Sequence, residues 1–311
     1  MNGWNLPVPR PPPPFLRPRA VATTALLGRR TPPPVWAFPA GKATIMDTPT
    51  RQRHGRTLLS ALTAALGAGA LLVAMAPAAH ADTRLHVIGG QDATEQYPFM
   101  VSLRDNQGTH GCGGALIDAE WVVTAGHCAA FRHPEQITAR VGSNDRTAGG
   151  TEAAVSRIAL HPGFSSGSSW AADIALLKLD RPVPQEPISI GPEAGGAGTP
   201  VRILGWGMTC DDAEECPPPA DLQEVDSELV PADRCTDADA GSELCVEHPT
   251  EQAQACSGDS GGPLVRGGPG RWELVGATSR DGDDNAVCAT GPGIWTDVTV
   301  YADWIERTVA G

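Results

Sequence analysis

Basic residues are scarce in this chain, and cysteine is absent from its first 81 residues. The 311 residues include 23 Lys and Arg against 36 Asp and Glu, a formal net charge of −13. This acidic balance argues against a nucleic-acid-binding surface, which needs clustered cationic side chains to meet phosphates. No repeat of fixed period is present, and no long amphipathic helical pattern appears before residues 300–309. The apolar fraction of 41% argues against wholesale disorder.

Charge and cysteine content divide the chain into two parts. Residues 1–81 hold nine of the 23 basic residues and one of the 36 acidic residues, so residues 82–311 keep 14 and 35, a net charge of −21. All eight cysteines lie in this second part. The sequence therefore predicts a basic leader joined to a strongly acidic body.

The end of the leader has the three parts of a secretory signal. Arg51, Arg53 and Arg56 precede an apolar run over residues 58–75, and the Ala-His-Ala sequence at 79–81 offers small side chains before a cleavage site. We interpret residues 46–81 as a cleaved signal peptide, which predicts a secreted, extracellular protein. A retained membrane anchor is the alternative, since the run is about long enough to span a bilayer.

The start of the leader is rich in proline. The proline runs at 11–14 and 32–34 forbid helix and favour extended polyproline, so residues 1–45 are interpreted as a disordered extension. Translation from Met46 would leave this extension out of the protein.

Eight cysteines in an exported body indicate disulfide bonds before metal ligands. Cys210 and Cys216 lack a paired CxxC motif and a nearby pair of histidines, so their spacing does not favour zinc. Eight cysteines can pair in many ways, and spacing alone leaves the pairing open.

Short apolar stretches alternate with Gly, Pro, Asp and Ser clusters throughout the body. This pattern is typical of short strands with frequent turns, and it predicts an all-β sandwich or barrel with one closing helix over residues 300–309. The acidic stretches at 211–215 and 281–284 are interpreted as solvated loops. The predicted strands are residues 99–103, 114–117, 121–123, 174–177, 201–204 and 274–276.

Three segments carry candidate catalytic side chains. The TAGHC segment at 124–128 contains His127, the DIALL segment at 173–177 begins with Asp173, and the GDSGGP segment at 258–263 places Ser260 in a glycine-rich turn. A serine hydroxyl needs a base to accept its proton, and that base needs an acid to fix its tautomer. Each segment alone is more typical of a structural histidine, a strand end or a turn, but together they predict a catalytic triad.

The order of these residues excludes one fold. The Gly-x-Ser-x-Gly pattern also occurs at the nucleophile of α/β-hydrolases, where the histidine follows the serine. Here the last histidine is His248, so none follows Ser260.

With these motifs the chain resembles the secreted chymotrypsin-like (trypsin superfamily) serine endopeptidases, especially the bacterial trypsin-like ones. The resemblance covers residues 87–311 and also rests on the VIGG sequence at 87–90 and the GWG sequence at 205–207. It implies a chymotrypsin-like all-β fold of two antiparallel six-stranded β-barrels with a C-terminal helix, the barrels meeting near residues 182–200.

The resemblance implies a role for each catalytic residue. Ser260 would be the nucleophile, His127 the general base and then general acid, and Asp173 the acid that orients His127. The backbone N–H groups of Gly258 and Ser260 would form the oxyanion hole. Ser279 would support Asp173 and begin the strand that pairs with the substrate backbone.

The resemblance also implies activation by proteolysis. Cleavage before Val87 would free an α-amine that pairs with Asp259, and residues 82–86 would be a short propeptide. Because that cut follows His86 rather than Arg84, we expect an activating protease that cuts before bulky apolar residues. The implied disulfides are Cys112–Cys128, Cys210–Cys216, Cys235–Cys245 and Cys256–Cys288.

The substrate pocket departs from the trypsin pattern. Gln254 stands where trypsins have aspartate, and a neutral amide can hydrogen-bond a cationic side chain without neutralising it. Arg280 and Asp281 follow Ser279, where the family usually has tryptophan and glycine. Asp281 would either supply an acid for basic substrates or lie in a solvated loop. Gly293 matches a pocket-wall glycine that keeps the pocket open.

The sequence therefore predicts a secreted serine endopeptidase that hydrolyses peptide bonds through an acyl-enzyme. Protein or peptide substrates, protein protease inhibitors and an activating protease are the expected partners, with no nucleic acid and no stable membrane association. We expect a monomer without cofactor or metal. The rival hypothesis is a protease-like binding protein that kept the fold and lost catalysis, against which the intact triad argues.

Overall fold

The computed structural model describes residues 87–311, apart from residues 167–169, 211–213, 215, 251, 284 and 286. The predicted proline-rich extension, signal peptide and propeptide lie outside the described residues. Within the described part, no helix is long and apolar enough to cross a membrane.

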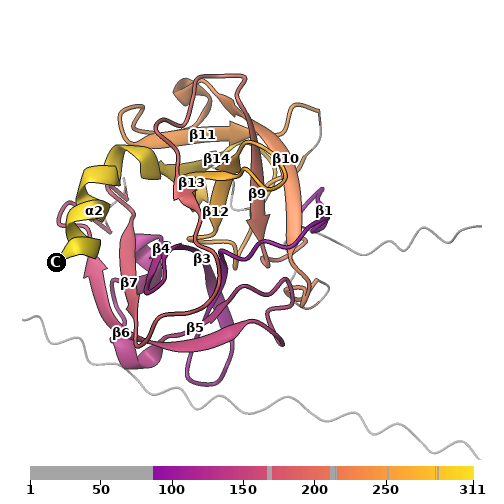
Figure 1. Cartoon of the computed structure of the whole chain (residues 1–311). Coiled ribbons are helices and arrows are strands. Elements are labelled where there is room, and N and C mark those ends of the chain that lie inside the picture. Colours follow the sequence, from indigo (N-terminus) through magenta and orange to yellow (C-terminus); the bar gives the residue numbers. More distant parts are fainter. Residues whose placement is uncertain are drawn as a thin grey trace, which may run out of the picture. The chain divides into compact units, whose positions relative to one another are not determined.

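The first barrel closes from six antiparallel strands (Figure 1). Strand β2 pairs with both β3 and β5, so the ring has no free edge. Its interior is filled by buried aliphatic side chains such as Val101, Leu116 and Leu177. In order around the ring, the strands are β2 (Met100–Arg104), β3 (His110–Asp118), β4 (Trp121–Thr124), β7 (Ala175–Leu179), β6 (Thr151–Leu160) and β5 (Thr138–Val141).

The second barrel also closes from six strands, because β9 pairs with both β10 and β12. Ile203, Leu264 and Val275 are buried in its core. Two short strands extend the sheet: β1 (Gln91–Asp92) pairs with β10, and β8 (Ser189–Ile190) pairs parallel to β13. The ring runs β9 (Pro200–Gly205), β10 (Gln223–Val230), β11 (Glu243–Glu247), β14 (Gly293–Asp297), β13 (Glu273–Asp281) and β12 (Pro263–Arg266).

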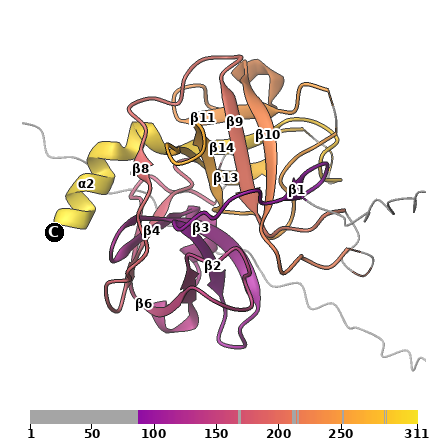
Figure 2. The same ribbon diagram turned by 45° about the vertical axis from the view of Figure 1, so that its right-hand side comes forward.

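The helices are few and short among the described residues. The α-helices are α1 (Gly126–Ala129) and α2 (Ala302–Ala310), and single 3-10 turns lie at η1 (Pro134–Gln136), η2 (Ala232–Arg234) and η3 (Val298–Tyr301). Figure 2 shows β2, β3 and β6 in the lower barrel, β9, β10 and β13 in the upper one, and α2 at their side.

The predicted fold is confirmed: two closed six-stranded antiparallel barrels with one short C-terminal helix. One local interpretation was wrong, since Asp281 is the last residue of β13 and not the start of a loop. It pairs across the sheet with Gly293 of β14, a register that no local sequence pattern reveals.

Four disulfide bonds link the loops around the barrels, and they join the same four pairs that the resemblance implied. Cys112–Cys128 connects β3 to α1, and Cys256–Cys288 spans 32 residues around the second barrel. The other two bonds, Cys210–Cys216 and Cys235–Cys245, close short loops. All eight cysteines are therefore oxidised in pairs, as fits an extracellular protein.

Candidate active site

His127 and Asp173 form a close hydrogen-bonded pair. His127 lies on α1, directly after β4, and its Nδ1 is 2.8 Å from Oδ2 of Asp173. The backbone N–H of His127 also donates to Oδ1 of the same carboxylate, at 2.8 Å. Because an ionised carboxylate only accepts hydrogen bonds, it fixes the proton of the ring on Nδ1 and leaves Nε2 as the basic nitrogen.

The second barrel also holds Asp173. The hydroxyl of Ser279 on β13 donates to Oδ2 of Asp173 at 2.7 Å, and Thr296 on β14 donates to the Asp173 backbone carbonyl at 2.9 Å. Asp173 is only 1% exposed. Its carboxylate is therefore buried with three donors, which offset the loss of solvation.

Ser260 lies in a tight turn whose backbone conformation requires glycine at positions 258 and 261. Gly258 and Gly261 have φ angles of +103° and +75°, a region that L side chains rarely adopt. A Cβ atom at Gly261 would lie 2.1 Å from Oγ1 of Thr124. The Ser260 carbonyl accepts from the N–H of Gly113 in the first barrel at 2.8 Å, which fixes the turn against that barrel.

The turn leaves two backbone donors free for a ligand. Within the described part of the chain, the N–H groups of Gly258 and Ser260 have no hydrogen-bond acceptor. Two backbone N–H groups of one turn without a protein partner can bind a negatively charged oxygen.

Asp259 is fully buried beneath this turn. Its Oδ1 accepts from the N–H of Gly207 at 2.7 Å, and its Oδ2 accepts from the N–H of Cys256 at 2.9 Å. Burial raises the pKa of Asp259 to about 6, although the two hydrogen bonds oppose this shift. Val87 is also fully buried, in the core of the second barrel.

His110 supports the same turn, and sequence reasoning missed it. Its Nε2 is 2.9 Å from the carbonyl oxygen of Gly258, and its Nδ1 is 2.8 Å from Oγ of Ser102. A carbonyl only accepts, so Nε2 carries the proton and Nδ1 accepts from the serine hydroxyl. Burial lowers the pKa of His110 to about 4, which keeps the ring neutral. No local sequence pattern indicates this contact.

Trp170 is a second residue that sequence reasoning missed. Its ring meets the His127 ring edge-to-face, with 5.2 Å between the centroids. Its φ of +43° is unusual for a residue other than glycine. The indole therefore covers one side of the candidate base, and only the fold brings the two rings together.

One grouping of metal-ligand types occurs among the described residues, formed by Cys112, His127 and Cys128. Both sulfurs are joined in a disulfide, so neither is a thiolate that could bind a metal ion. The grouping does not fit a metal centre.

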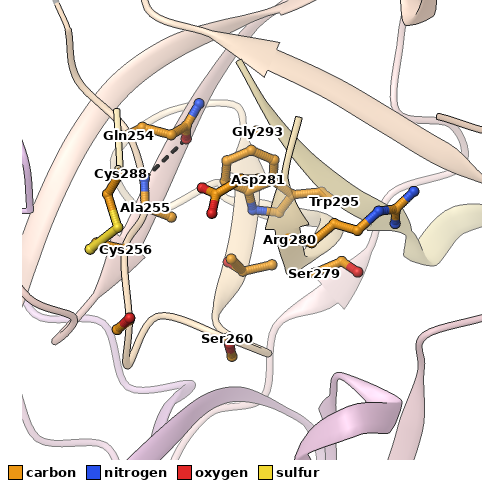
Figure 3. Close-up of a pocket in the computed structure, with 12 residues that line it drawn as sticks. Gln254, Ala255, Cys256, Ser260, Ser279, Arg280, Asp281, Cys288, Gly293 and Trp295 are labelled. Atoms are coloured by element: carbon orange, nitrogen blue, oxygen red, sulfur yellow. Dashed lines mark hydrogen bonds between the residues drawn. A yellow bond between two sulfur atoms is a disulfide. The ribbon is translucent and has the colours of Figure 1, made fainter. Parts of the chain in front are cut away.

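A pocket of about 220 Å³ opens next to Ser260, and it gathers the predicted substrate-binding residues (Figure 3). They come from the β13 and β14 strands and from the loop before Ser260. The residues that line it are Gln254, Ala255, Cys256, Ser257, Ser260, Thr278, Ser279, Arg280, Asp281, Cys288, Gly293 and Trp295.

Gln254 forms part of the pocket wall, and its side-chain amide is hydrogen-bonded to the protein backbone. It is 2% exposed, its Nε2 donates to the carbonyl of Val246 at 3.0 Å, and its Oε1 accepts from the N–H of Ala255 at 3.0 Å (Figure 3). Both amide atoms therefore already have a hydrogen-bond partner in the protein backbone.

Arg280 and Asp281 have different surroundings. The Arg280 guanidinium donates to both carboxylate oxygens of Glu243, at 2.5 and 2.9 Å. Figure 3 shows Arg280 extending away from Gln254, whereas the Asp281 carboxylate points toward that side of the pocket. Successive residues of a strand point to opposite faces, which accounts for the difference.

The absence of a side chain at Gly293 leaves room for two other residues of the pocket wall. A Cβ atom there would lie 2.6 Å from the Trp295 ring and 3.0 Å from the Gln254 amide carbon. Trp295 is 1% exposed, and its indole N–H has no hydrogen-bond partner among the described residues.

Comparison with known proteins shows the family to which the chain belongs. The trypsin family model matches residues 87–305. The chain is 33% identical over 238 residues to a trypsin of Sarcophaga bullata, covering 71% of this chain and 88% of that protein. It is also 33% identical over 234 residues to trypsin theta of Drosophila melanogaster, covering 70% and 84%. Both relatives are insect trypsins, so they give no support to the bacterial type, which stays a prediction. The chain belongs to the trypsin family and is a serine endopeptidase.

Proposed function

We propose that the protein is a secreted serine endopeptidase in which Ser260, His127 and Asp173 act as a catalytic triad, and in which cleavage before Val87 activates a precursor. The observation that carries the proposal is the His127–Asp173 pair. A carboxylate with contacts from both barrels holds the imidazole so that Nε2 is free to take a proton.

Hydrolysis would proceed in two halves. His127 Nε2 takes the Ser260 hydroxyl proton while Oγ attacks the peptide carbonyl, and the oxyanion that forms is bound by the N–H groups of Gly258 and Ser260. His127 then protonates the leaving amine, which completes the acyl-enzyme. A water molecule, deprotonated by the same ring, attacks the ester and restores Ser260. Asp173 stabilises the imidazolium in both halves and keeps its own charge.

Activation would use the buried acid beneath the turn. Val87 follows His86 in the chain, so its nitrogen is a peptide amide before cleavage. Cleavage would give a cationic amine, and Asp259 is the buried carboxylate that such an amine can neutralise. Because Asp259 also accepts from the N–H of Cys256, the new ion pair would stabilise the loop that leads to Ser260.

The leader and the remaining partners complete the proposal. We assign residues 1–45 to an extension, 46–81 to a signal peptide, 82–86 to a propeptide and 87–311 to a monomeric protease domain. The net charge of −21 over residues 82–311 would attract basic protein substrates and repel acidic ones. Protein inhibitors that fill the pocket beside Ser260 and an activating protease are the other expected partners.

Labelling with a serine-directed phosphonate tests the proposed mechanism. The chain is prepared to start at Val87 and incubated with the phosphonate and a library of chromogenic peptides. We expect a covalent adduct on Ser260, peptide hydrolysis, and loss of both in Ser260→Ala. Ser189→Ala, an exposed serine on β8, is the matched control and should label normally. A properly folded Val87 chain that neither labels nor hydrolyses any peptide would instead support the protease-like binding protein.

A further inference from the structure

Glu224 on β10 is a buried acid that gathers hydrogen-bond donors from the N-terminal segment, which we define as residues 88–96. Its side chain is 1% exposed. Oε1 accepts from Nε2 of Gln91 at 3.2 Å and from the hydroxyl of Thr94 at 2.8 Å. Oε2 accepts from the N–H of Thr94 at 3.1 Å and from the hydroxyl of Tyr97 at 2.6 Å. Because the Tyr97 ring is buried in a hydrophobic core, Glu224 attaches the N-terminal segment to a fixed part of the protein.

Arg202 on β9 supplies a positive charge beside Glu224. Its Nη1 is 3.1 Å from Oε1 of Glu224, and its guanidinium also donates to both carboxylate oxygens of Asp226, at 2.6 and 2.9 Å. Burial raises the pKa of Glu224, but hydrogen bonds from residues 94 and 97 and the charge of Arg202 outweigh it and hold the pKa below the usual glutamate value. Glu224 is therefore ionised at neutral pH, the state that accepts hydrogen bonds most strongly.

Pairing through β1 is a weaker attachment of the N-terminal segment. This strand has two residues, both exposed, and it lies alongside β10 (Figure 2). A strand this short contributes few backbone hydrogen bonds and buries little apolar surface. Hydrogen bonds to an ionised carboxylate are about twice as strong as bonds between neutral groups, so the Glu224 contacts are the stronger attachment.

The other end of the N-terminal segment lies near the turn that holds Ser260. The carbonyl of Ile88 accepts from the N–H of Gln254 at 3.1 Å, on the loop that leads to that turn. Val87, the next residue toward the predicted cleavage site, is fully buried in the second barrel. A residue that fixes this segment therefore also restricts where the Val87 nitrogen can lie.

We propose that Glu224 is a positioning residue of this protease, which attaches Gln91 and Thr94 to the second barrel and so holds the Val87 amine at Asp259 once cleavage has freed it. This inference rests on the proposed function, in which the amine pairs with Asp259 to activate the precursor. Glu224 is not part of the pocket wall, and it acts on the site through the amine.

The length of the free tether gives the size of the effect. Gln91 follows Val87 by four positions, whereas Tyr97, the next residue whose ring is fixed in the core, follows it by ten. The effective concentration of a tethered group falls roughly as the −3/2 power of the tether length. Loss of the Glu224 contacts should therefore lower the effective concentration of the amine at Asp259 by about 4-fold.

Chemical modification of the amine tests the proposal without requiring catalysis. A chain that starts at Val87 contains two amines, the α-amine of Val87 and the ε-amine of Lys178, because no other lysine follows residue 87. The chain carries Ser260→Ala and is treated with a trace of acetic anhydride, and mass spectrometry measures acetylation at both sites. An amine that is buried against a carboxylate is protected, so the acetylation rate at Val87 follows the fraction of chains in which it is undocked.

We expect acetylation of Val87 to be about 4-fold faster in Glu224→Gln than in the parent. The rate at Lys178 should stay the same, because its side chain lies on β7 of the other barrel and is 40% exposed in any case. Lys178 thus serves as an internal reference, since general unfolding would change the rates at both amines.

Two more variants complete the test. Glu228→Gln is the matched control, because it removes the same charge from the same strand at a position whose neighbours are Pro200 and Glu247. Its Val87 amine should react as in the parent. Thr94→Val removes one donor to Glu224 from an exposed side chain, and it should raise the rate by about twofold. This variant decides the question if Glu224→Gln does not fold.

The outcomes separate the role of Glu224 from the proposed function. Equal protection of the amine in the parent, Glu224→Gln and Thr94→Val would overturn the role of Glu224 and leave the pair with Asp259 standing. The same acceleration in Glu228→Gln would also overturn it, because the effect would then follow from net charge.

Failure of the proposed function would look different. A parent amine that reacts as fast as that of a free Val-Ile dipeptide would refute the pair with Asp259, and the role of Glu224 with it. Protection that depends on Glu224, in a chain whose Ser260 never labels with phosphonate, would support the attachment and refute the catalytic proposal.

Discussion

Cleavage before Val87 should change how the stability of the protein depends on pH. In the uncleaved chain, Asp259 is fully buried and burial raises its pKa from 3.8 to about 6. As the pH rises from about 4 to 6, the unfolded chain loses this proton before the folded chain does. The Asp259 contribution to the unfolding free energy therefore falls across that range and is constant above it. A shift of about two pKa units corresponds to about 3 kcal/mol.

In the cleaved chain, the unfolding free energy should not fall in this way as the pH rises. A cationic amine at Val87 favours the ionised carboxylate, so it lowers the pKa of Asp259 and removes the penalty. We expect the cleaved form to gain stability over the uncleaved form as the pH rises from 4 to 6, by about 3 kcal/mol. Other carboxylates titrate in the same range, but they are common to both forms and cancel in the difference.

Urea unfolding followed by tryptophan fluorescence measures this difference. The chain carries Ser260→Ala to prevent self-digestion, and residues 82–86 are replaced by a recognition sequence for a protease that cuts before residue 87. A form whose recognition sequence lies two residues further from Val87, so that cleavage leaves two extra residues before Val87, is the control and should behave like the uncleaved chain. A difference between the cleaved and uncleaved forms that stays constant from pH 4 to 7 would refute the buried ion pair.

Two further substitutions test the supports of the site. Ser279→Ala removes the hydroxyl that donates to Asp173, and it should lower kcat by about 10- to 100-fold. Stopped-flow kinetics would measure kcat and would show that phosphonate still reacts with Ser260. An unchanged kcat would mean that this hydrogen bond has no catalytic role. Gly207→Ala places a Cβ atom 2.2 Å from Oδ2 of Asp259 and should lower the unfolding free energy by about 1–3 kcal/mol in urea. Gly196→Ala, which meets nothing within 4 Å, should leave it unchanged, and equal effects of the two substitutions would contradict the packing argument.

The sequence predicts candidate catalytic residues because the chemistry of a serine protease needs fixed residue types in short motifs. His127 and Ser260 lie in turns whose glycines are required by backbone geometry, so the motifs are visible in a single chain. Asp173 is predicted by its place before a buried strand. Its contact with Ser279 was implied by the family resemblance and could not follow from local sequence, because the two residues belong to different barrels.

The pocket could be predicted only in part. The sequence shows that Gln254 replaces an acid, but its hydrogen bond to Val246 depends on a contact with another strand. Whether Arg280 or Asp281 points inward depends on strand register, and the pairing of β13 with β14 shifts between Thr278 and Arg280. His110 escaped detection because a lone histidine has no distinguishing pattern, and its two partners lie at sequence distances of 8 and 148 residues.

The carboxylate of Asp173 accepts from α1 of one barrel and from β13 of the other, and its carbonyl accepts from β14. The candidate active site therefore depends on how the two barrels pack together, and neither barrel contains it alone. A small sliding of one barrel against the other would separate Ser279 from Asp173. In the proposed mechanism, catalysis would therefore depend on the alignment of the two barrels, and changes at their interface would alter the rate without touching substrate.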